Sequence, residues 1–328
     1  MGIYLVFLIL GGVFKKTGTI NYLSAVGDFI FTPKSKIESI NKRTNILILG
    51  KAGKGSTAPD LTDTIIFASI SHKEPSATLI SLPRDIWIPA LRAKLNSAYY
   101  WGDQKQTGGG LVLAKSTAEE IVGEPIQYAL VVDFSGFKKL IDVLGGIDIN
   151  IDRSFVDEKF PILGRENDLC DGDKEFKCRY ETIRFEKGLM SMDGETALKF
   201  VRSRNAQGDE GTDIAREQRQ QKVISGIKAK ILNPRTFLNP VKDLQIWKVV
   251  RESIETDINS SGVAILVRRG IQSGKNISSD IIPKELLINP TISPQYDNQY
   301  VFVPRKGRLS DGRFDWSEIE GWVGNLLR

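Results

Sequence analysis

The chain has 328 residues, of which 41% are hydrophobic and 26% charged, and its formal net charge is +5. This composition is typical of a globular protein with a sizeable core, and the mild positive charge favours an anionic partner. With a single histidine, His72, and only two cysteines, we do not expect a histidine-rich zinc site or a histidine-based nucleophilic triad. We expect His72 to be a solvated loop residue.

The first predicted element is an apolar segment, Ile3 to Phe14, which Lys15 and Lys16 follow. A helix of this length spans about 18 Å, less than the ~30 Å hydrocarbon core of a membrane. The segment fits a signal-peptide core, a buried strand or the end of a membrane anchor, although a signal peptide normally carries basic residues before its core. We expect residues 1–16 to be a single-pass anchor whose true start lies upstream, and residues 17–43 to be a linker.

The next segment, from Thr44, reads as the start of an α/β domain that extends to residue 328. Apolar runs predict strands over residues 46–49, 64–70 and 77–82, with turn residues between them. The first run ends in a loop rich in Gly and Lys, Gly50 to Thr57. It does not match the phosphate loop of nucleotide-binding proteins, because Ser56 stands where that motif requires Lys.

Helices and strands then alternate. Residues 111–122 predict a helix, residues 126–132 a strand, residues 134–144 a helix capped by Asp133, and residues 147–151 another strand. This alternation predicts a layered α/β domain.

An acidic segment over residues 153–187 should be a surface excursion. Its cysteines, Cys170 and Cys178, lack the further Cys or His that a zinc site needs. A disulfide is the favoured interpretation and two free thiols are the alternative. The disulfide would imply an oxidising, extracytoplasmic compartment.

The following two helices carry arginines close to their buried faces. In the helix expected from Thr212 to Leu232, an apolar stripe on one face is formed by Val223, Ile224, Ile227 and Ile231. Continued toward the helix start, this stripe reaches Asp213, Arg216 and Gln220, and Arg219 lies beside it. Such groups need partners when they are buried, either an ion-pair network or a ligand.

Arg202 and Arg204 lie just upstream, at the end of the helix that begins at Asp193. On an extended exit from that helix their side chains would point the same way. With Arg216 and Arg219 they favour a site for a polyanion.

A third charged group follows the strands. Arg84 and Asp85 come directly after the third apolar run, at the strand end where ligands of α/β sheets tend to bind. Asp63 lies just before its own strand, and Lys94 adds a cation nearby. Several cations with a few carboxylates suit phosphate or pyrophosphate, with or without a divalent cation.

Together these motifs resemble the LytR-CpsA-Psr family. The shared stretches are LTDT, SLPRD, KLNSAY, VVDFSGF, LIDVLGGIDINI, LMSMDGETALKFVRSR and the helix carrying Asp213, Arg216, Arg219 and Gln220. The resemblance implies a three-layer α-β-α domain around a central mixed sheet, anchored in the cell membrane and placed on its extracytoplasmic face. It also implies transfer of a glycopolymer, such as a teichoic acid or capsule, from a polyprenyl-pyrophosphate carrier to peptidoglycan, with release of polyprenyl phosphate. It does not specify the polymer.

The same resemblance implies roles for individual residues. The expected pyrophosphate ligands are Arg84, Lys94, Arg202, Arg204, Arg216, Arg219 and Gln220. Asp63 would bind Mg²⁺ or Mn²⁺, and either Asp85 or Asp213 would act as the base for the attacking sugar hydroxyl. Asp63, Arg84, Asp85 and Asp213 are therefore the expected catalytic residues.

Two positions depart from the family pattern. Lys51-Ala52 stands where a second metal-binding Asp is usual, and Leu61 stands where Arg is common. We expect Lys51 or Lys54 to neutralise phosphate instead, and dependence on the metal to be weakened.

Two other functions stay open: a polyprenyl-pyrophosphate-binding protein without transfer activity, and a pyrophosphatase that uses water as acceptor. A nucleic-acid partner is not expected, because the chain has no basic helix with interleaved aromatic residues. We expect the C-terminal helix around Trp316 and Trp322 to pack on the domain core.

Overall fold

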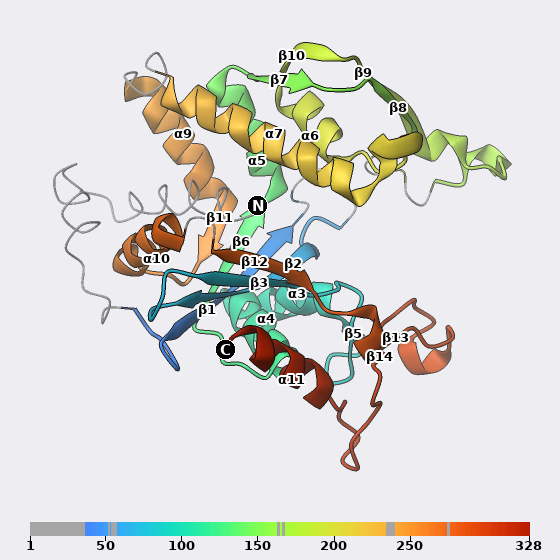
Figure 1. Ribbon diagram of the computed structural model, residues 1–328. Coiled ribbons are helices and arrows are strands. Elements are labelled where there is room, and N and C mark those ends of the chain that lie inside the picture. The colour runs from blue at the N-terminus through green and yellow to red at the C-terminus, as the bar shows by residue number, and fades with distance from the viewer. Residues whose placement is uncertain are drawn as a thin grey trace. The chain divides into compact units, whose positions relative to one another are not determined.

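The computed structural model describes residues 37–51, 53, 58–162, 165, 168–233, 240–273 and 276–328 (Figure 1). The expected membrane anchor, most of the linker and Lys54 lie outside these residues. Within the described ranges, no helix has both the length and the apolar character needed to cross a membrane.

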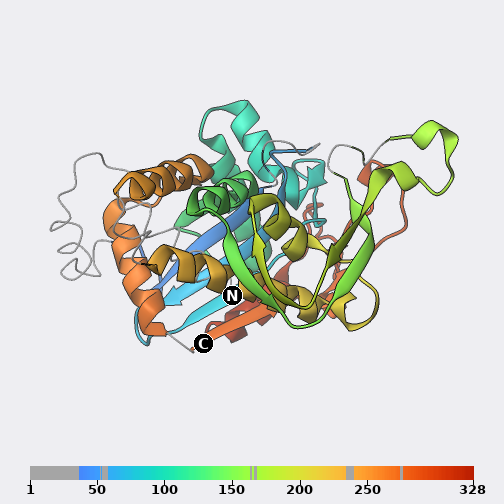
Figure 2. The ribbon, with the colours of Figure 1, turned by 90° about the horizontal axis from the view of Figure 1, so that it is seen from above.

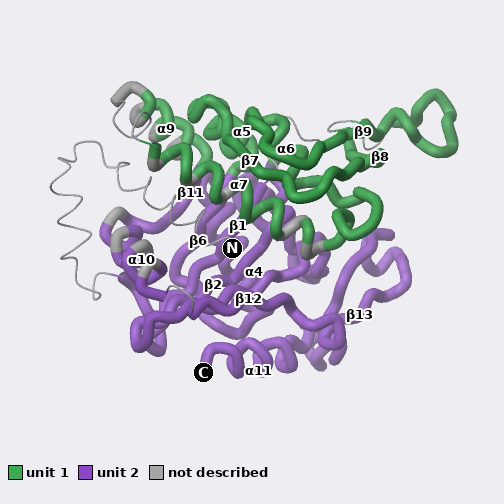
Figure 3. Tube along the Cα trace, turned by 45° about the horizontal axis from the view of Figure 1, so that its top comes forward, with its two compact units in different colours: residues 1–6, 53–59, 133–253 green, residues 7–52, 60–132, 254–328 purple. Residues whose placement is uncertain are grey.

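The described chain forms two compact units (Figure 3). Unit 1 contains residues 53, 58–59 and the described part of 133–253, and unit 2 contains the described residues of 37–51, 60–132 and 254–328. In the sequence, most of unit 1 therefore lies between two segments that belong to unit 2.

Unit 2 is built on a six-stranded sheet with the strand order β11-β6-β1-β2-β3-β12. The strands are β1 (Arg43–Lys51), β2 (Thr62–Ser71), β3 (Ala77–Ser81), β6 (Tyr128–Asp133), β11 (Ile254–Thr256) and β12 (Ile277–Ile281). β1 pairs antiparallel with β2, and β2 with β3, whereas β12 pairs parallel with β3. The prediction of a mixed sheet is therefore confirmed.

The core of unit 2 lies between this sheet and three helices: α3 (Ala98–Lys105), α4 (Gly109–Val122) and α11 (Ser317–Leu326). Alternate residues of β1 and β2, such as Leu49 and Phe67, pack against Ile121 of α4 and Ile319 of α11 in one buried cluster. α10 (Ser260–Ser273) lies on the opposite side of the sheet in Figure 1.

Short strand pairs complete unit 2: β4 (Trp87–Ile88) with β5 (Ala93–Lys94), and β13 (Leu287–Ile288) with β14 (Val303–Pro304). The C-terminal helix packs as predicted, because Trp316 is buried and Trp322 is partly buried against the same core.

The described residues of unit 1 form α-helices and two antiparallel ribbons (Figure 2). The helices are α5 (Phe134–Leu144), α6 (Gly194–Arg202), α7 (Asp213–Leu232) and α9 (Pro240–Ser253). The ribbons are β7 (Ile147–Ile151) with β10 (Gly188–Met192), and β8 (Phe155–Pro161) with β9 (Tyr180–Phe185). The rings of Phe155, Phe185 and Phe200 pack together in this unit with centroids 5.0–5.9 Å apart.

Side-chain caps fix the starts of α5, α6 and α7. Asp133 accepts a hydrogen bond from the Ser135 amide, Asp193 from the Thr196 amide and Thr212 from the Ala215 amide. The predicted cap at Asp133 is therefore confirmed, and so is the expected end of the second arginine-bearing helix at Leu232.

Three expectations need correction. Only the middle of the segment 153–187 is a surface excursion, because β8 and β9 bury Phe160 and Ile183. His72 is half-buried rather than solvated, with its Nε2 atom 2.8 Å from Thr44 Oγ1. Asp63 lies within β2 rather than before it. The predicted disulfide between Cys170 and Cys178 is present.

Candidate functional site

Four of the predicted residues in unit 2 form a chain of alternating charges. Arg84 Nη1 lies 2.5 Å from Asp63 Oδ1, and Arg84 Nε lies 3.5 Å from Asp85 Oδ2. Lys94 Nζ lies 2.8 Å from the other oxygen of Asp85. The structure thus brings Asp63, Arg84, Asp85 and Lys94 together just beyond the end of β3.

The backbone around Arg84 is held by its neighbours. Ile86 and Trp87, which follow the charged pair, are almost fully buried and fix the turn to the core. The Arg84 carbonyl accepts a hydrogen bond from the Asn96 amide at 3.1 Å. The buried Thr62 hydroxyl donates to the Asn96 carbonyl at 3.0 Å and so connects β2 to the same turn. The charged side chains therefore extend from a rigid support.

The electrostatics of this cluster leave one cation accessible. The side chains of Asp63 and Arg84 are 45% and 50% exposed, whereas those of Asp85 and Lys94 are about half as exposed. Partial burial lowers the pKa of Arg84, but attraction to Asp63 and Asp85 outweighs this effect, so the pKa lies above its ordinary value. Arg84 is thus a permanent cation that an anionic ligand can reach.

Lys51 lies at the end of β1, where the pairing with β2 is irregular. Its Nζ atom is 3.3 Å from Asp60 Oδ1 and 5.5 Å from the ring centre of Tyr99. The Tyr99 hydroxyl donates to Glu255 at 2.6 Å, and burial together with this bond raises the tyrosine pKa well above its ordinary value. Lys51 is therefore an anchored cation, and its contact with phosphate stays a prediction.

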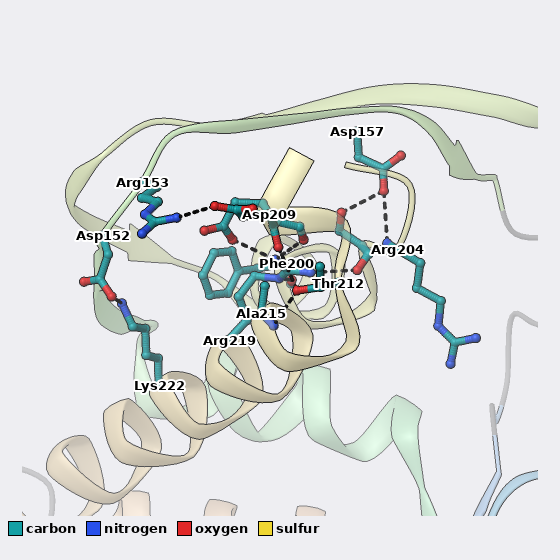
Figure 4. Close-up of polar contacts among 12 residues, drawn as sticks. Asp152, Arg153, Asp157, Phe200, Arg204, Asp209, Thr212, Ala215, Arg219 and Lys222 are labelled. Atoms are coloured by element: carbon teal, nitrogen blue, oxygen red, sulfur yellow. Dashed lines mark hydrogen bonds and ion pairs between the residues drawn. The ribbon is translucent and has the colours of Figure 1, made fainter. Parts of the chain in front are cut away.

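In unit 1, Arg202 and Arg204 lie where α6 ends. Arg202 is the last helical residue, and Ser203 leaves the helix in an extended conformation with ψ 129°. Ser203 is fully buried, while Arg202 and Arg204 on either side of it are exposed. The predicted extended exit is confirmed. Figure 4 shows the Arg204 side chain directed away from the polar contacts around its backbone.

Arg219 of α7 is buried, with only 3% of its surface exposed. The buried line of α7 runs through Ala215, Arg219, Val223 and Ile227 at a spacing of four residues. Arg219 therefore continues the apolar stripe instead of lying beside it, which corrects the sequence-based placement.

The other predicted residues of α7 are less fully described. Gln220 is partly exposed. The backbones of Asp213 and Arg216 belong to the first two turns of the helix, but their side chains lie outside the described part of the structure. Their roles stay predictions.

Sequence reasoning missed one buried acid, Asp157 of β8. Its carboxylate is fully buried and accepts hydrogen bonds from the Ser203 hydroxyl and from the amides of Arg204 and Asn205 (Figure 4). It lies in a segment expected to be a solvated excursion, so its charge gave no signal of burial. The hydrophobic residues Phe155 and Phe160 on the same strand were the only local indication.

The described residues of unit 2 contain no group of three carboxylates within reach of one ion, and the role of Asp63 as a metal ligand stays a prediction. Asp63 is engaged by Arg84, and Asp85 is engaged by Arg84 and Lys94. In the described parts of the chain, the one group of three potential ligands within reach of one another is Asp168 with Cys170 and Cys178, whose sulfurs are joined in the disulfide.

Comparison with known proteins gives the family. The model of the LytR_cpsA_psr family matches residues 24–312. The chain belongs to the LytR-CpsA-Psr family. A relative from Enterococcus faecalis, named polyisoprenyl-teichoic acid–peptidoglycan teichoic acid transferase TagU, is 30% identical over 69% of this chain and 65% of its own length. A Bacillus subtilis relative, with the corresponding name for TagV, is 28% identical over 77% of this chain and 58% of its own. The chain thus spans under two thirds of the length of both relatives.

Solved structures of low sequence identity share the fold of this family member. The Lin1025 protein from Listeria innocua gives a TM-score of 0.51 at 23% identity, over 87% of this chain and 96% of that one. The gbs0355 protein from Streptococcus agalactiae gives the same TM-score and identity, over 87% of this chain and 88% of that one.

Proposed function

We propose that this protein transfers a glycopolymer from a polyprenyl-pyrophosphate carrier to peptidoglycan and releases polyprenyl phosphate. The observation that carries the proposal is the half-exposed Arg84, held between Asp63 and Asp85 at the end of β3 in a chain of the LytR-CpsA-Psr family. The names of the two curated relatives, both teichoic acid transferases, support the same reaction class.

In the proposed reaction, a sugar hydroxyl of peptidoglycan attacks the phosphorus that carries the glycan. A new phosphorus–oxygen bond forms, and the bond from that phosphorus to the bridging oxygen of the pyrophosphate breaks. Polyprenyl phosphate leaves with the bridging oxygen, while Asp85 or Asp213 takes the hydroxyl proton. Negative charge grows on the leaving phosphate, so fixed cations such as Arg84 and Lys94 lower the barrier.

The ion pairs explain how Arg84 can serve such a reaction. A guanidinium offers five donors in a planar fork, and in this structure two of its nitrogens contact carboxylates. These contacts orient the side chain before a ligand arrives, which reduces the entropy lost on binding. The arrangement favours recognition of phosphate oxygens by the remaining donors.

We also infer that the protein works at the outer face of the cell membrane, with its helices and sheet in the three-layer arrangement of the family. The Cys170–Cys178 disulfide supports this location, because disulfides persist in oxidising compartments. The apolar segment over residues 3–14 supports attachment to the membrane.

The test is a transfer assay with the full chain, a polyprenyl-pyrophosphate-linked oligosaccharide and peptidoglycan fragments, followed by mass analysis of both products. We expect glycan attached through a phosphodiester, and about a hundredfold loss of rate in Arg84→Ala, the size found when one transition-state donor is removed. Arg313→Ala is the matched control, because Arg313 is an exposed arginine of unit 2 paired with Asp311.

The assay also separates the two other functions. Release of both polyprenyl phosphate and a glycan that ends in phosphate, without attachment, would identify a pyrophosphatase. Binding of the carrier without either product would identify a carrier-binding protein.

A further inference from the structure

Two buried charges hold the turn that carries Arg204. This turn, residues 203–205, lies between the end of α6 and the β-bridge of Ala206 to Asp157. One is the carboxylate of Asp157 on β8, which is 0% exposed, and the other is the guanidinium of Arg219 on α7, which is 3% exposed. Burial of a charged group is costly unless its hydrogen bonds are satisfied. Both groups satisfy theirs largely on this turn and its immediate neighbours.

Asp157 binds the donors of the turn. Its Oδ2 atom accepts from the Ser203 hydroxyl at 2.7 Å, from the Arg204 amide at 3.2 Å and from the Asn205 amide at 3.1 Å. Its Oδ1 atom accepts from the Lys159 amide at 3.1 Å. Three consecutive residues are thus fixed by a single oxygen.

Arg219 binds the acceptors on the other side. Its Nη2 donates to the Ser203 carbonyl at 2.9 Å, and its Nε donates to the Phe200 carbonyl at 3.1 Å in the last turn of α6. Its Nη1 donates to the carbonyl and the carboxylate of Glu210, at 2.8 and 3.0 Å. The guanidinium also lies over the Phe155 ring, 4.8 Å from its centre.

We propose that Asp157 and Arg219 are positioning residues, which fix the exit of α6 so that Arg202 and Arg204 present their guanidinium groups to the phosphates of an anionic ligand. This inference rests on the proposed function and deepens it. The buried Ser203 is the point where both charges act, and the exposed arginines stand on either side of it. A turn fixed in the free protein binds more tightly than one that must be ordered by the ligand.

In this proposal Arg219 acts through the turn, whereas its sequence pattern suggested direct contact with pyrophosphate. Its Nε, Nη1 and Nη2 atoms all donate to protein acceptors. A ligand could engage Arg219 only by displacing bonds that hold α6 and the turn together.

The test measures the affinity of the full chain for inorganic pyrophosphate by titration calorimetry. Asp157→Asn removes the negative charge and one of the two acceptor oxygens, so the side chain can no longer satisfy the donors on both oxygens. We expect about tenfold weaker binding, as for loss of charge-assisted bonds. Asp152→Asn is the matched control, an exposed aspartate of the same unit paired with Lys222 at 2.6 Å. We expect its affinity to equal that of the wild type.

A double-mutant cycle separates positioning from general damage to the fold. If Asp157 acts through Arg202 and Arg204, Asp157→Asn should cost less affinity in the Arg204→Ala background than in the wild type. An equal loss in both backgrounds would overturn the proposal. Ser203→Ala removes one of the three hydrogen bonds and no charge, so it should give a smaller loss of pyrophosphate affinity. This variant replaces Asp157→Asn in the test if Asp157→Asn does not fold.

Hydrogen exchange supplies a readout that does not depend on any ligand. Asp157→Asn should speed exchange of the Arg204 and Asn205 amides, while the amides of α9 keep their wild-type rates. Faster exchange with unchanged pyrophosphate affinity would overturn the positioning proposal and leave the proposed transfer reaction intact. A wild-type protein that neither binds pyrophosphate nor transfers glycan would overturn both.

Discussion

Two arginines of this chain show how burial separates residues of the same type. Arg84 is half-exposed, touches two carboxylates and keeps donors for a ligand, whereas Arg219 is buried and donates to main-chain carbonyls and one glutamate. Both follow motifs that predicted pyrophosphate contacts. The sequence pattern therefore indicated that both positions belong to the site. Their burial and hydrogen bonds distinguish an arginine that can contact a ligand from one that contacts the protein itself.

At the same residue scale, the pairing of Asp63 with Arg84 leads to a prediction about metal dependence. Because Asp63 belongs to no group of three potential metal ligands among the described residues and a guanidinium lies 2.5 Å from it, we expect chelation by EDTA to slow transfer by less than about tenfold. A required Lewis-acid metal supplies several kcal/mol, so its removal would cost more than about a hundredfold. The measurement is the transfer rate with EDTA and with added Mg²⁺.

Asp63→Asn and Lys51→Ala complete this experiment. Asp63→Asn removes the ion pair that orients Arg84, and we expect a slower rate that added Mg²⁺ does not restore. Lys51→Ala should also slow transfer, because Lys51 is the expected substitute cation. A full Mg²⁺ requirement, abolished by Asp63→Asn, would show that Asp63 is a metal ligand after all.

The limits of prediction for single residues follow from distance along the chain. Asp63, Arg84, Asp85 and Lys94 were predicted together from motifs at strand ends, and the structure unites them. Asp157 was not predicted, because its main partners are 46 to 48 residues away. No local pattern distinguishes such an aspartate from a solvated one.

At the scale of elements, local periodicity predicted some boundaries well. The helix α5 and the strand β7 have the bounds expected from sequence, because caps, glycines or apolar spacing mark their ends. β8 and β9 were missed. Their burial pattern is irregular, with a register shift between Asp157 and Phe160, so the strict alternation that reveals a strand is absent.

Close packing of α5 and α6 gives a prediction for stability. A Cβ atom at Gly194 would lie 2.2 Å from the Lys138 carbonyl oxygen, whereas nothing lies within 4 Å of one at Gly321 in α11. We expect Gly194→Ala to reduce the free energy of unfolding by about 1–3 kcal/mol through overpacking. Gly321→Ala should raise it by about 0.5–1 kcal/mol through helix propensity. Denaturant titration measures both, and equal shifts in the same direction would contradict the packing argument.

At the scale of the whole molecule, the disulfide predicts the compartment. The chain has two cysteines, Cys170 and Cys178, and they are bonded to each other. We expect both thiols to resist a maleimide reagent in intact host cells and to react only after reduction, because an extracytoplasmic disulfide persists. The double variant Cys170→Ser/Cys178→Ser is the control that should never react. Labelling without a reductant would place the protein in a reducing compartment.

The net charge of +5 predicts how the whole molecule meets its substrate. Attraction of an anionic carrier by surface cations weakens as salt is added, since the Debye length falls from about 10 Å at 0.1 M to about 3 Å at 1 M. We therefore expect the KM for a vesicle-borne polyprenyl-pyrophosphate substrate to rise severalfold over this range, while kcat changes little. Arg202→Gln/Arg204→Gln should lessen the salt dependence, because it removes two exposed cations, and Arg313→Gln, at a paired surface arginine, should leave it unchanged. A KM that does not respond to salt would show that apolar contacts with the prenyl chain, rather than charge, govern capture of the carrier.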